Sequence, residues 1–415
     1  MILCAMFLTS AEAALVRERF GTPCYVYDRA ALEAAARAAL AFPQAFGFTL
    51  RYAMKANPSH AVLGLFRDLG LHIDASSDPE VERALGAGFA PARIQLTSQV
   101  PSRRLEEFVA LGVLYNACSL HQLDRYGRAF PERAAIIRVN PGLGSGSTKR
   151  TNTGGPASSF GIWHAYLDEA KTLAARHRLA IRGLHTHIGS GSDPAVWTRV
   201  AGLVLEIAAR LPDVTTVSLG GGFKVARVPG EQATDLVAVG SVVREAFVDF
   251  HRRTGRKLRL EIEPGAYLVA NGGAVVATCV DVVDTGEDGY LFAKLDAGMT
   301  EVTRPSLYGA QHPITVVAGG RATARVVFVG PCCESGDVLT PAPGDPEALT
   351  PREVPRPEIG DLVVVGGAGA YCAAMCTGNY NSYPLAPEVL REPDGSLRLV
   401  RRRQTLEQML TNEVE

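Results

Sequence analysis

Short apolar runs alternate with amphipathic stretches from about residue 25 to residue 270. The runs end in small or polar residues, and the stretches between most of them have helical periodicity, as in PSHAVLGLFRDLG, DPEVERALGAG and SRRLEEFVALG. The eight runs are FGFTLRYAMKAN, LHIDASS, RIQLTSQ, LYNACS, AAIIRVNPG, IRGLHTHIGSGS, VTTVSLGGGF and LRLEIEPG. Eight strands that alternate with helices predict an α/β fold, the (β/α)8 TIM barrel.

Polar residues and glycines stand at the C-terminal ends of these predicted strands. They are Lys55, Asp74, Ser98, Arg138, His187, Gly220, Gly221, Gly222 and Glu263. The C-terminal ends of barrel strands meet at one rim, which carries the catalytic residues in such barrels. Because the placement recurs on most of the runs, we expect a functional site at this rim.

After about residue 270 the pattern changes to β-branched runs separated by Gly, Pro and Asp turns. The runs are GAVVATCVDVVDT, YLFAKLDAG, ITVVAG, ATARVVFVG and DLVVVGG. They predict a second, mainly β domain. The Pro-rich stretch TPAPGDPEALTPREVPRPEIG is interpreted as a surface loop of that domain.

The composition is typical of a globular enzyme that acts on small-molecule substrates. The 415 residues are 47% hydrophobic and 20% charged, with a formal net charge of −1. This balance excludes an electrostatic hold on nucleic acid or on a membrane surface. Eight scattered cysteines without paired CxxC spacing or histidine partners indicate reduced thiols in the cytoplasm and no metal site.

The first residues, MILCAMFLTSAEAA, are apolar. They lack the basic residues that begin a signal peptide, and the run is too short to span a membrane. We therefore expect a buried N-terminal segment and a cytoplasmic protein.

Lys55 follows a predicted strand in RYAMKANP. Taken alone, it is more typical of a lysine whose stem covers apolar surface while its amine stays in water. In a barrel mouth, however, desolvation would lower its pKa and suit the amine to a Schiff base.

Three other features admit two interpretations each. The triplet Gly220, Gly221 and Gly222 and the segment HIGSGS present backbone N–H groups suited to phosphate, although a tight turn explains a glycine triplet equally well. Glu263 could pair with a protonated pyridine nitrogen or be a solvated strand-end carboxylate. His187 could stack on a cofactor ring or be a core histidine bonded to backbone.

Together the motifs YAMKAN, HTHIGSGS, LGGGF, EIEPG, GPCCESGD and GAGAYCAAMCTGNYN strongly resemble the fold-type III, alanine-racemase-like, pyridoxal-phosphate-dependent decarboxylases. The resemblance extends from Tyr25 to about Leu390, with six motifs in the family's order. It implies a cofactor-binding barrel at residues 26–270 and a β domain formed by residues 1–25 and 271–415. It also implies pyridoxal 5'-phosphate as cofactor and a homodimer with shared active sites.

The resemblance also implies residue roles. Lys55 corresponds to the Schiff-base lysine, His187 to the ring-stacking histidine and Glu263 to the partner of the pyridine nitrogen. The remaining expected cofactor-binding residues are Asp74, Arg138, Ser190, Gly220, Gly221, Gly222, Gly265 and Tyr371. Cys333 resembles the cysteine that a partner subunit contributes for protonation, with Glu334 beside it as a substrate contact.

The segment LDAGMTEVTRPSLYGAQH resembles that of the diaminopimelate decarboxylases. The substrate-binding residues that this implies are Arg304, Tyr308 and, from the later motif, Tyr371. The guanidinium of Arg304 is planar, so it suits a distal carboxylate and repels an ammonium. Ornithine decarboxylases and related diamine-forming enzymes instead carry an aspartate, to meet a distal ammonium, where this chain has Gly309. Ala266 departs from the family, which has arginine at this position.

The expected activity is the conversion of meso-diaminopimelate to L-lysine in lysine biosynthesis. One alternative is a related decarboxylase of another acidic or carrier-bound amino acid. Another is a dimeric protein without catalytic activity, which the presence of Lys55, Glu263 and Cys333 disfavours.

Overall fold

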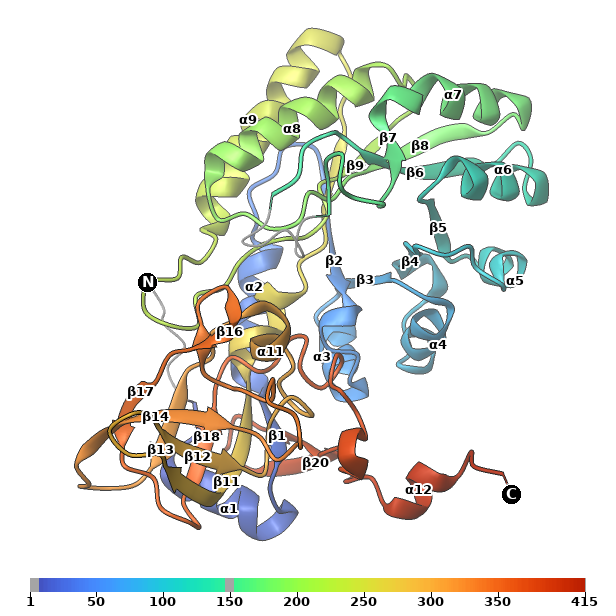
Figure 1. The fold of residues 1–415 in the computed structure, drawn as a ribbon. Coiled ribbons are helices and arrows are strands. Elements are labelled where there is room, and N and C mark those ends of the chain that lie inside the picture. Colours follow the sequence, from blue (N-terminus) through green and yellow to red (C-terminus); the bar gives the residue numbers. More distant parts are fainter. Residues whose placement is uncertain (1–6, 146–152, 415) are drawn as a thin grey trace. The chain divides into compact units, whose positions relative to one another are not determined.

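Eight parallel strands close into a barrel in the computed structural model, which describes residues 7–145 and 153–414 (Figure 1). The strands are β2 (Phe48–Ala53), β3 (His72–Ala75), β4 (Ile94–Leu96), β5 (Leu114–Ala117), β6 (Ala134–Asn140), β8 (Ala180–His185), β9 (Thr216–Ser218) and β10 (Arg259–Ile262). They pair in the order β5-β4-β3-β2-β10-β9-β8-β6, and β5 also pairs with β6. Each of the eight apolar runs contains one of these strands, so the predicted barrel is confirmed.

Helices connect successive barrel strands. They are α2 (Arg29–Leu40), which precedes β2, and α3 (His60–Asp68), α4 (Asp78–Gly86), α5 (Leu105–Leu111), α6 (Leu120–Ala129), α7 (Leu167–Arg176), α8 (Pro194–Ala209) and α9 (Leu236–Thr254). A short α10 (Ala266–Val269) follows β10, and a two-residue strand β7 (Ile162–Trp163) pairs with β6. Local sequence explains their starts: the Ser77 hydroxyl accepts a hydrogen bond from the Glu80 backbone N–H at 3.3 Å and caps α4.

The chain divides into two compact units. The barrel unit comprises Ala35–Lys224 and Gln232–Leu268. The other unit, called the β unit here, comprises the described part of Met1–Ala34 together with Val225–Glu231 and Val269–Glu415. The segment Val225–Glu231 joins the β unit although it lies between two barrel strands in sequence, an assignment that hydrophobic periodicity does not reveal.

The β unit is a mainly antiparallel sheet. Its strands are β1 (Cys24–Asp28), β11 (Gly273–Asp284), β12 (Leu291–Leu295), β13 (Ile314–Val317), β14 (Thr323–Val329), β17 (Arg352–Pro355), β18 (Leu362–Val365), β19 (Glu388–Arg391) and β20 (Leu397–Arg401). Its helices are α1 (Ser10–Phe20), α11 (Arg304–Tyr308) and α12 (Leu406–Leu410). The predicted mainly β domain is confirmed.

One core of the β unit joins residues from both ends of the chain. Leu8 and Val16 pack with Val26, Val276 and Val389. Leu8 is 1% exposed, as expected for a buried N-terminal segment, while Met1–Met6 lie outside the described residues. No helix in the described ranges has the length and apolarity needed to cross a membrane.

The prediction of a loop at residues 340–360 was wrong. The stretch forms the hairpin β15 (Pro341–Ala342) and β16 (Asp345–Leu349), and then β17, which pairs with β14. Gly344 turns the hairpin at a φ of +78°. Prolines are tolerated here because β17 lies at the edge of its sheet and β15 belongs to a two-stranded one, where a missing N–H costs no interior hydrogen bond.

Candidate active site

The predicted rim residues of the barrel unit lie at the C-terminal ends of its strands. Lys55 lies in a 3₁₀ turn, Met54–Ala56, directly after β2. Asp74 lies in β3 and Arg138 in β6, while His187 and Ser190 follow β8. Gly220, Gly221 and Gly222 follow β9, and Glu263 and Gly265 follow β10. The barrel therefore brings this part of the predicted site together at one rim.

Lys55 is exposed in the single chain. The turn that carries it is held by the Tyr52 hydroxyl, which donates to the Asn57 carbonyl at 2.9 Å. A 3₁₀ turn at the rim points the side chain out of the packed strand layer. The desolvation expected of a barrel mouth therefore needs atoms that the described residues of the single chain do not provide.

A buried acid accompanies Lys55. Asp74 is 3% exposed, and its Oδ1 atom has no hydrogen-bond partner among the described residues. Burial and the Glu263 charge raise the pKa of Asp74, and the positive charge of Lys55 lowers it. Glu80, which the sequence analysis missed, has its pKa raised by burial and lowered by a backbone hydrogen bond from Ser76 and by Lys55.

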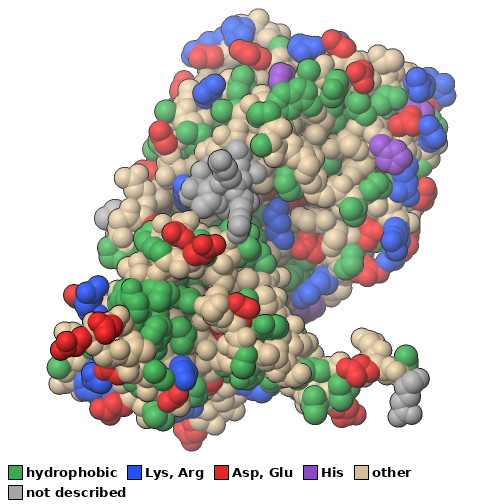
Figure 2. All heavy atoms as spheres, viewed as in Figure 1, with side chains coloured by type: hydrophobic (Ala, Val, Ile, Leu, Met, Phe, Trp, Pro, Cys, Tyr) green, Lys and Arg blue, Asp and Glu red, His purple; other side chains and the backbone are tan. Residues whose placement is uncertain are grey.

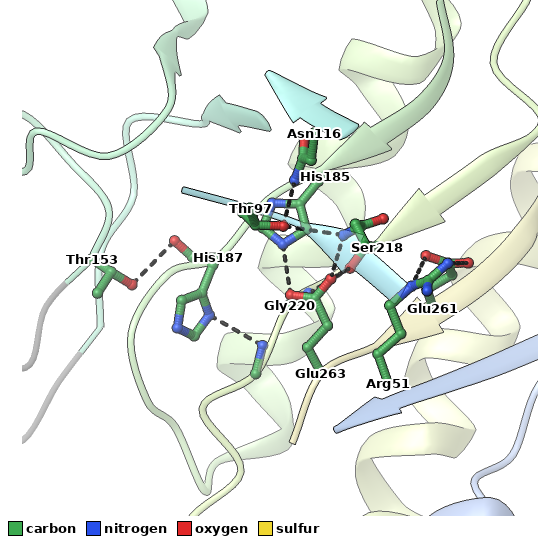
Figure 3. Close-up of polar contacts among 12 residues, drawn as sticks. Arg51, Thr97, Asn116, Thr153, His185, His187, Ser218, Gly220, Glu261 and Glu263 are labelled. Atoms are coloured by element: carbon green, nitrogen blue, oxygen red, sulfur yellow. Dashed lines mark hydrogen bonds and ion pairs between the residues drawn. The ribbon is translucent and has the colours of Figure 1, made fainter. Parts of the chain in front are cut away.

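Glu263 is the centre of a buried hydrogen-bond cluster (Figure 3). Its Oε1 atom accepts from Gln95 Nε2 at 3.2 Å and from Ser218 Oγ at 3.0 Å, and its Oε2 atom lies 2.7 Å from His185 Nε2. Burial raises the pKa of Glu263, but the contact with His185 and the charge of Arg51 act together against burial, and the pKa lies below its usual range. The carboxylate is 5% exposed and stays ionised, with capacity for one more donor.

Gln95, His185 and Ser218 were missed in the sequence. Each stands inside an apolar run, which is where an unpaired polar side chain would be costly. That cost was a usable signal, because a polar residue tolerated there needs a partner. Their shared partner, Glu263, is 45 to 168 residues away in sequence, so the apolar run does not identify it.

The glycine triplet forms a cradle that admits no side chain. A Cβ atom would lie 2.5 Å from the Thr186 carbonyl oxygen at Gly220, 2.4 Å from the Glu263 carbonyl oxygen at Gly221 and 2.1 Å from the Gly189 carbonyl oxygen at Gly222. Gly220 and Gly222 also have φ values of +69° and +105°. Glycine is therefore required at all three positions by close packing at the rim. At Gly220 and Gly222 the positive φ of the backbone requires it as well.

His187 lies directly beside this cradle (Figure 3). Its Nδ1 atom accepts a hydrogen bond from the Gly221 N–H at 3.2 Å. Burial lowers the pKa of His187 well below its usual value, helped by the positive charges of Arg138 and Lys55. The ring is therefore neutral with its proton on Nε2, which suits a ring that stacks rather than one that carries charge.

Arg138 has an unused polar atom, and the backbone of Ser190 is held in place. Arg138 is buried, its Nη2 atom has no partner among the described residues, and its guanidinium lies 4.9 Å from the Phe160 ring centre. Ser190 is half-buried, and its backbone is held by Ser145 through two bonds of 2.8 Å. Gly265 is buried, and its carbonyl accepts from Leu268 at 3.1 Å.

The other predicted residues belong to the β unit. Arg304 and Tyr308 bound α11, Cys333 and Glu334 lie in an exposed turn, and Tyr371 follows β18. Tyr371 has a φ of +54°, a strained conformation that is frequent at functional sites.

The turn that carries Cys333 is held from within the β unit. The buried Asp337 accepts backbone hydrogen bonds from Cys332 at 2.9 Å and from Met299 at 2.6 Å. The Cys333 N–H donates to Asn381 Oδ1 at 2.9 Å. Asn381 itself has a φ of +50°. The turn therefore presents an exposed thiol on a fixed backbone.

His312 fixes the orientation of Arg304 and was also missed. Its Nδ1 atom lies 2.9 Å from the Gly366 carbonyl oxygen, so this nitrogen carries the proton. The Nε2 atom can then only accept, and it lies 3.0 Å from Arg304 Nη1. Burial and the Arg304 charge lower the pKa of His312 well below its usual value, which keeps the ring neutral.

The fit to a pyridoxal cofactor can be tested on these features. The cradle offers a side-chain-free surface for a phosphate, the ionised Glu263 can pair with a ring N–H, and Asp74 and Arg138 each have a buried polar atom without a partner. The barrel residues therefore fit such a group.

Charged side chains of both signs are mixed over the face seen in Figure 2, with no extended region of one sign. This distribution agrees with a small-molecule site rather than a nucleic-acid interface.

Comparison with known proteins agrees with the site. Residues 31–270 match the family described as "Pyridoxal-dependent decarboxylase, pyridoxal binding domain". The chain is 39% identical to the diaminopimelate decarboxylase of Streptomyces coelicolor over 98% of this chain and 93% of that protein. It is 37% identical to that of Escherichia coli K12 over 98% of this chain and 97% of that protein.

Solved structures agree with the sequence relatives. A crystal structure of diaminopimelate decarboxylase matches with a TM-score of 0.90 and 36% identity over 99% of both chains. The Helicobacter pylori diaminopimelate decarboxylase complexed with L-lysine matches with a TM-score of 0.84 and 26% identity, over 96% of this chain and 98% of that one.

Proposed function

This chain belongs to the pyridoxal-dependent decarboxylases, and from that membership we propose that it converts meso-diaminopimelate to L-lysine. It is a carboxy-lyase with pyridoxal 5'-phosphate as its cofactor. The full-length similarity to diaminopimelate decarboxylases supports the choice of substrate. The placement in lysine biosynthesis in the cytoplasm follows from that substrate and is part of the proposal.

The buried, ionised Glu263 at the barrel rim is the observation that carries the proposal. Pyridoxal phosphate, when bound, supplies a ring that accepts the electron pair left behind as CO2 departs. Glu263 can hold a proton on the ring nitrogen, since three neighbouring groups orient it and keep it charged. A carboxylate oriented in this way keeps the ring electron-poor, which decarboxylation requires.

The other rim residues take the roles that their positions allow. Lys55 would hold the cofactor covalently through its amine, and the neutral His187 would stack on the ring. The backbone N–H groups of the glycine cradle, with Ser190, would bind phosphate. Cys333 would give a proton to the substrate carbon after the bond to the carboxylate breaks, so one proton is taken up for each CO2 released.

Arg304 is the proposed ligand of the distal carboxylate of the substrate. His312 accepts from one edge of its guanidinium, which leaves the opposite edge free for a bidentate contact. A distal ammonium would meet like charge at the same place. This arrangement favours a diacid substrate over ornithine or lysine, even though Ala266 removes the arginine usual in the family.

Replacing Arg304 with alanine should raise KM for diaminopimelate by about tenfold or more, because a charged hydrogen bond is lost. We expect kcat to fall less, since Arg304 binds far from the bond that breaks. The matched control is Arg325→Ala, which removes an exposed arginine from β14 of the same unit. Steady-state kinetics with diaminopimelate, ornithine and lysine measure the effect. Faster turnover of ornithine or lysine than of diaminopimelate by the wild-type enzyme would refute the assignment.

We also infer a homodimer in which Cys333 serves the partner's barrel. The exposure of Cys333 and Glu334 in the single chain, and the exposure of Lys55, support this arrangement. In a composite site, the turn that carries Cys333 and Glu334 in one chain would cover Lys55 of the other chain.

Mixing Lys55→Ala chains with Cys333→Ala chains should restore activity, although each variant alone is inactive. Random exchange makes about half of the dimers mixed, and each mixed dimer has one intact site, so about a quarter of wild-type activity should return. The measurement is the rate of CO2 release after unfolding and refolding the two proteins together. Subunit exchange is verified with two affinity tags. Proven exchange without recovered activity would mean that each chain supplies its own cysteine.

A further inference from the structure

A cavity of about 380 Å³ lies at the N-terminal end of the barrel. Its wall includes Leu114, Ala134 and Thr216, which begin β5, β6 and β9. The cofactor rim lies at the other ends of the same strands. The cavity extends from there as far as His185 and Ser218, but its wall contains neither Lys55 nor His187 nor the glycine cradle. Its size is within the range of metabolite-binding pockets.

The cavity is lined by three arginines and one acid. Glu261 is the acidic member of its wall, and Arg51 binds it with two hydrogen bonds of 3.0 Å, from Nε and Nη2 (Figure 3). The other two arginines, Arg133 and Arg182, are exposed and have no acidic partner among the described residues. The wall therefore has a positive charge of two beyond its internal ion pair.

Backbone contacts fix where these two arginines stand. The Arg133 carbonyl accepts from the Ala180 N–H at 3.0 Å, and the Arg182 carbonyl accepts from the Thr215 N–H at 2.9 Å. Arg133 directly precedes β6, and Arg182 lies in β8, which pairs with β6, so both stand near the N-terminal ends of neighbouring strands.

Two buried nitrogens in the wall have no partner in the described part of the chain. Arg51 is 3% exposed, and its Nη1 atom is on the side of the guanidinium that Glu261 does not use. His185 is 2% exposed, and its Nδ1 atom is also unpaired, while its Nε2 atom contacts Glu263. The Nη1 of Arg51 is a donor, and a buried donor is normally satisfied, so the wall lacks an acceptor that something else must supply. The Nδ1 of His185 donates only when the ring is protonated.

We propose that this cavity binds a small anion through a carboxylate or phosphate group held by Arg51, Arg133 and Arg182. Guanidinium groups match the planar oxygens of both groups with paired hydrogen bonds. The site goes beyond the decarboxylase activity and does not depend on it. Its inner wall includes Gln95, His185 and Ser218, the same residues that hold Glu263, so the anion lies beside the shell of the catalytic carboxylate.

The test uses holoenzyme in which borohydride has fixed the cofactor, so that the phosphate cradle is already filled. Calorimetric titration with inorganic phosphate and, separately, with succinate measures binding to each chain. We expect one anion per chain, and the better binder of the two identifies the preferred group. Arg133→Ala and Arg182→Ala should each weaken binding by about tenfold, as for a lost charged hydrogen bond. Both side chains are exposed, so these variants should fold.

Two control variants locate the binding. Arg199→Ala removes an exposed arginine from α8 and should leave affinity unchanged. Arg304→Ala should also leave it unchanged, because it removes the proposed substrate ligand and not the cavity. The proposal is overturned if neither anion binds at about 10 mM, or if binding survives the Arg133→Ala, Arg182→Ala double variant. Binding lost in Arg304→Ala would place the anion in the substrate site instead and would equally overturn it.

Discussion

Replacing Lys55 with alanine should abolish decarboxylation, with kcat lowered at least about 10³-fold, because the amine that holds the cofactor is removed. The purified variant should also lose the absorbance of the covalently bound cofactor. In the wild-type enzyme, borohydride reduction and peptide mapping should place the cofactor on Lys55. The rim position in the turn Met54–Ala56 makes this amine accessible to the cofactor aldehyde.

The control for Lys55 is Lys171→Ala, a surface lysine in α7 that pairs with Asp168. It should keep both the cofactor and full activity. A cofactor label on another lysine, or full turnover by Lys55→Ala, would show that the assignment of the covalent site is mistaken.

Replacing Glu263 with glutamine should lower kcat by roughly 10²–10³-fold, since breaking a buried charged contact typically costs about 3–5 kcal/mol. The amide loses the negative charge and presents N–H groups toward Gln95, His185 or Ser218, which already donate to this position. Lys55 should still carry the cofactor, because its turn is independent of the Glu263 cluster.

Two measurements separate the catalytic effect of Glu263→Gln from loss of folding. Thermal unfolding followed by circular dichroism reports stability, and borohydride labelling of Lys55 reports cofactor binding. The expected variant is folded, labelled and slow. Turnover within about threefold of wild type would mean that Glu263 does not control the ring nitrogen, because such a small change is below 1 kcal/mol.

The alternation of short apolar runs with helical stretches determined the barrel. Strands of this kind bury both faces, and parallel strands joined by helices have few alternative arrangements. The rim position of Lys55, His187 and Glu263 followed directly, because the C-terminal ends of parallel barrel strands must meet at one end. The same reasoning holds for the glycine triplet after β9.

Hydrogen-bond partners were decided by tertiary structure alone. Gln95 and Glu263 are 168 residues apart, and their contact depends on barrel closure and on the register of every intervening strand. His312 and Arg304 are close in sequence, but the orientation of the His312 ring is set by the Gly366 carbonyl. That carbonyl reaches the ring only when the β unit is folded. Local patterns contain no information on such distant registers.

The wrong prediction of a loop has the same origin. Proline content at residues 340–360 indicated a loop, yet edge positions accept proline, and only the pairing of β17 with β14 reveals the edge. The burial expected for Lys55 stays a prediction, because it depends on atoms that the single chain does not supply. The sequence by itself therefore determined the class of fold and the chemical inventory of the rim. Tertiary structure decided which side chains are paired, exposed or left with an unused nitrogen, because those outcomes are set by packing between segments far apart in the chain.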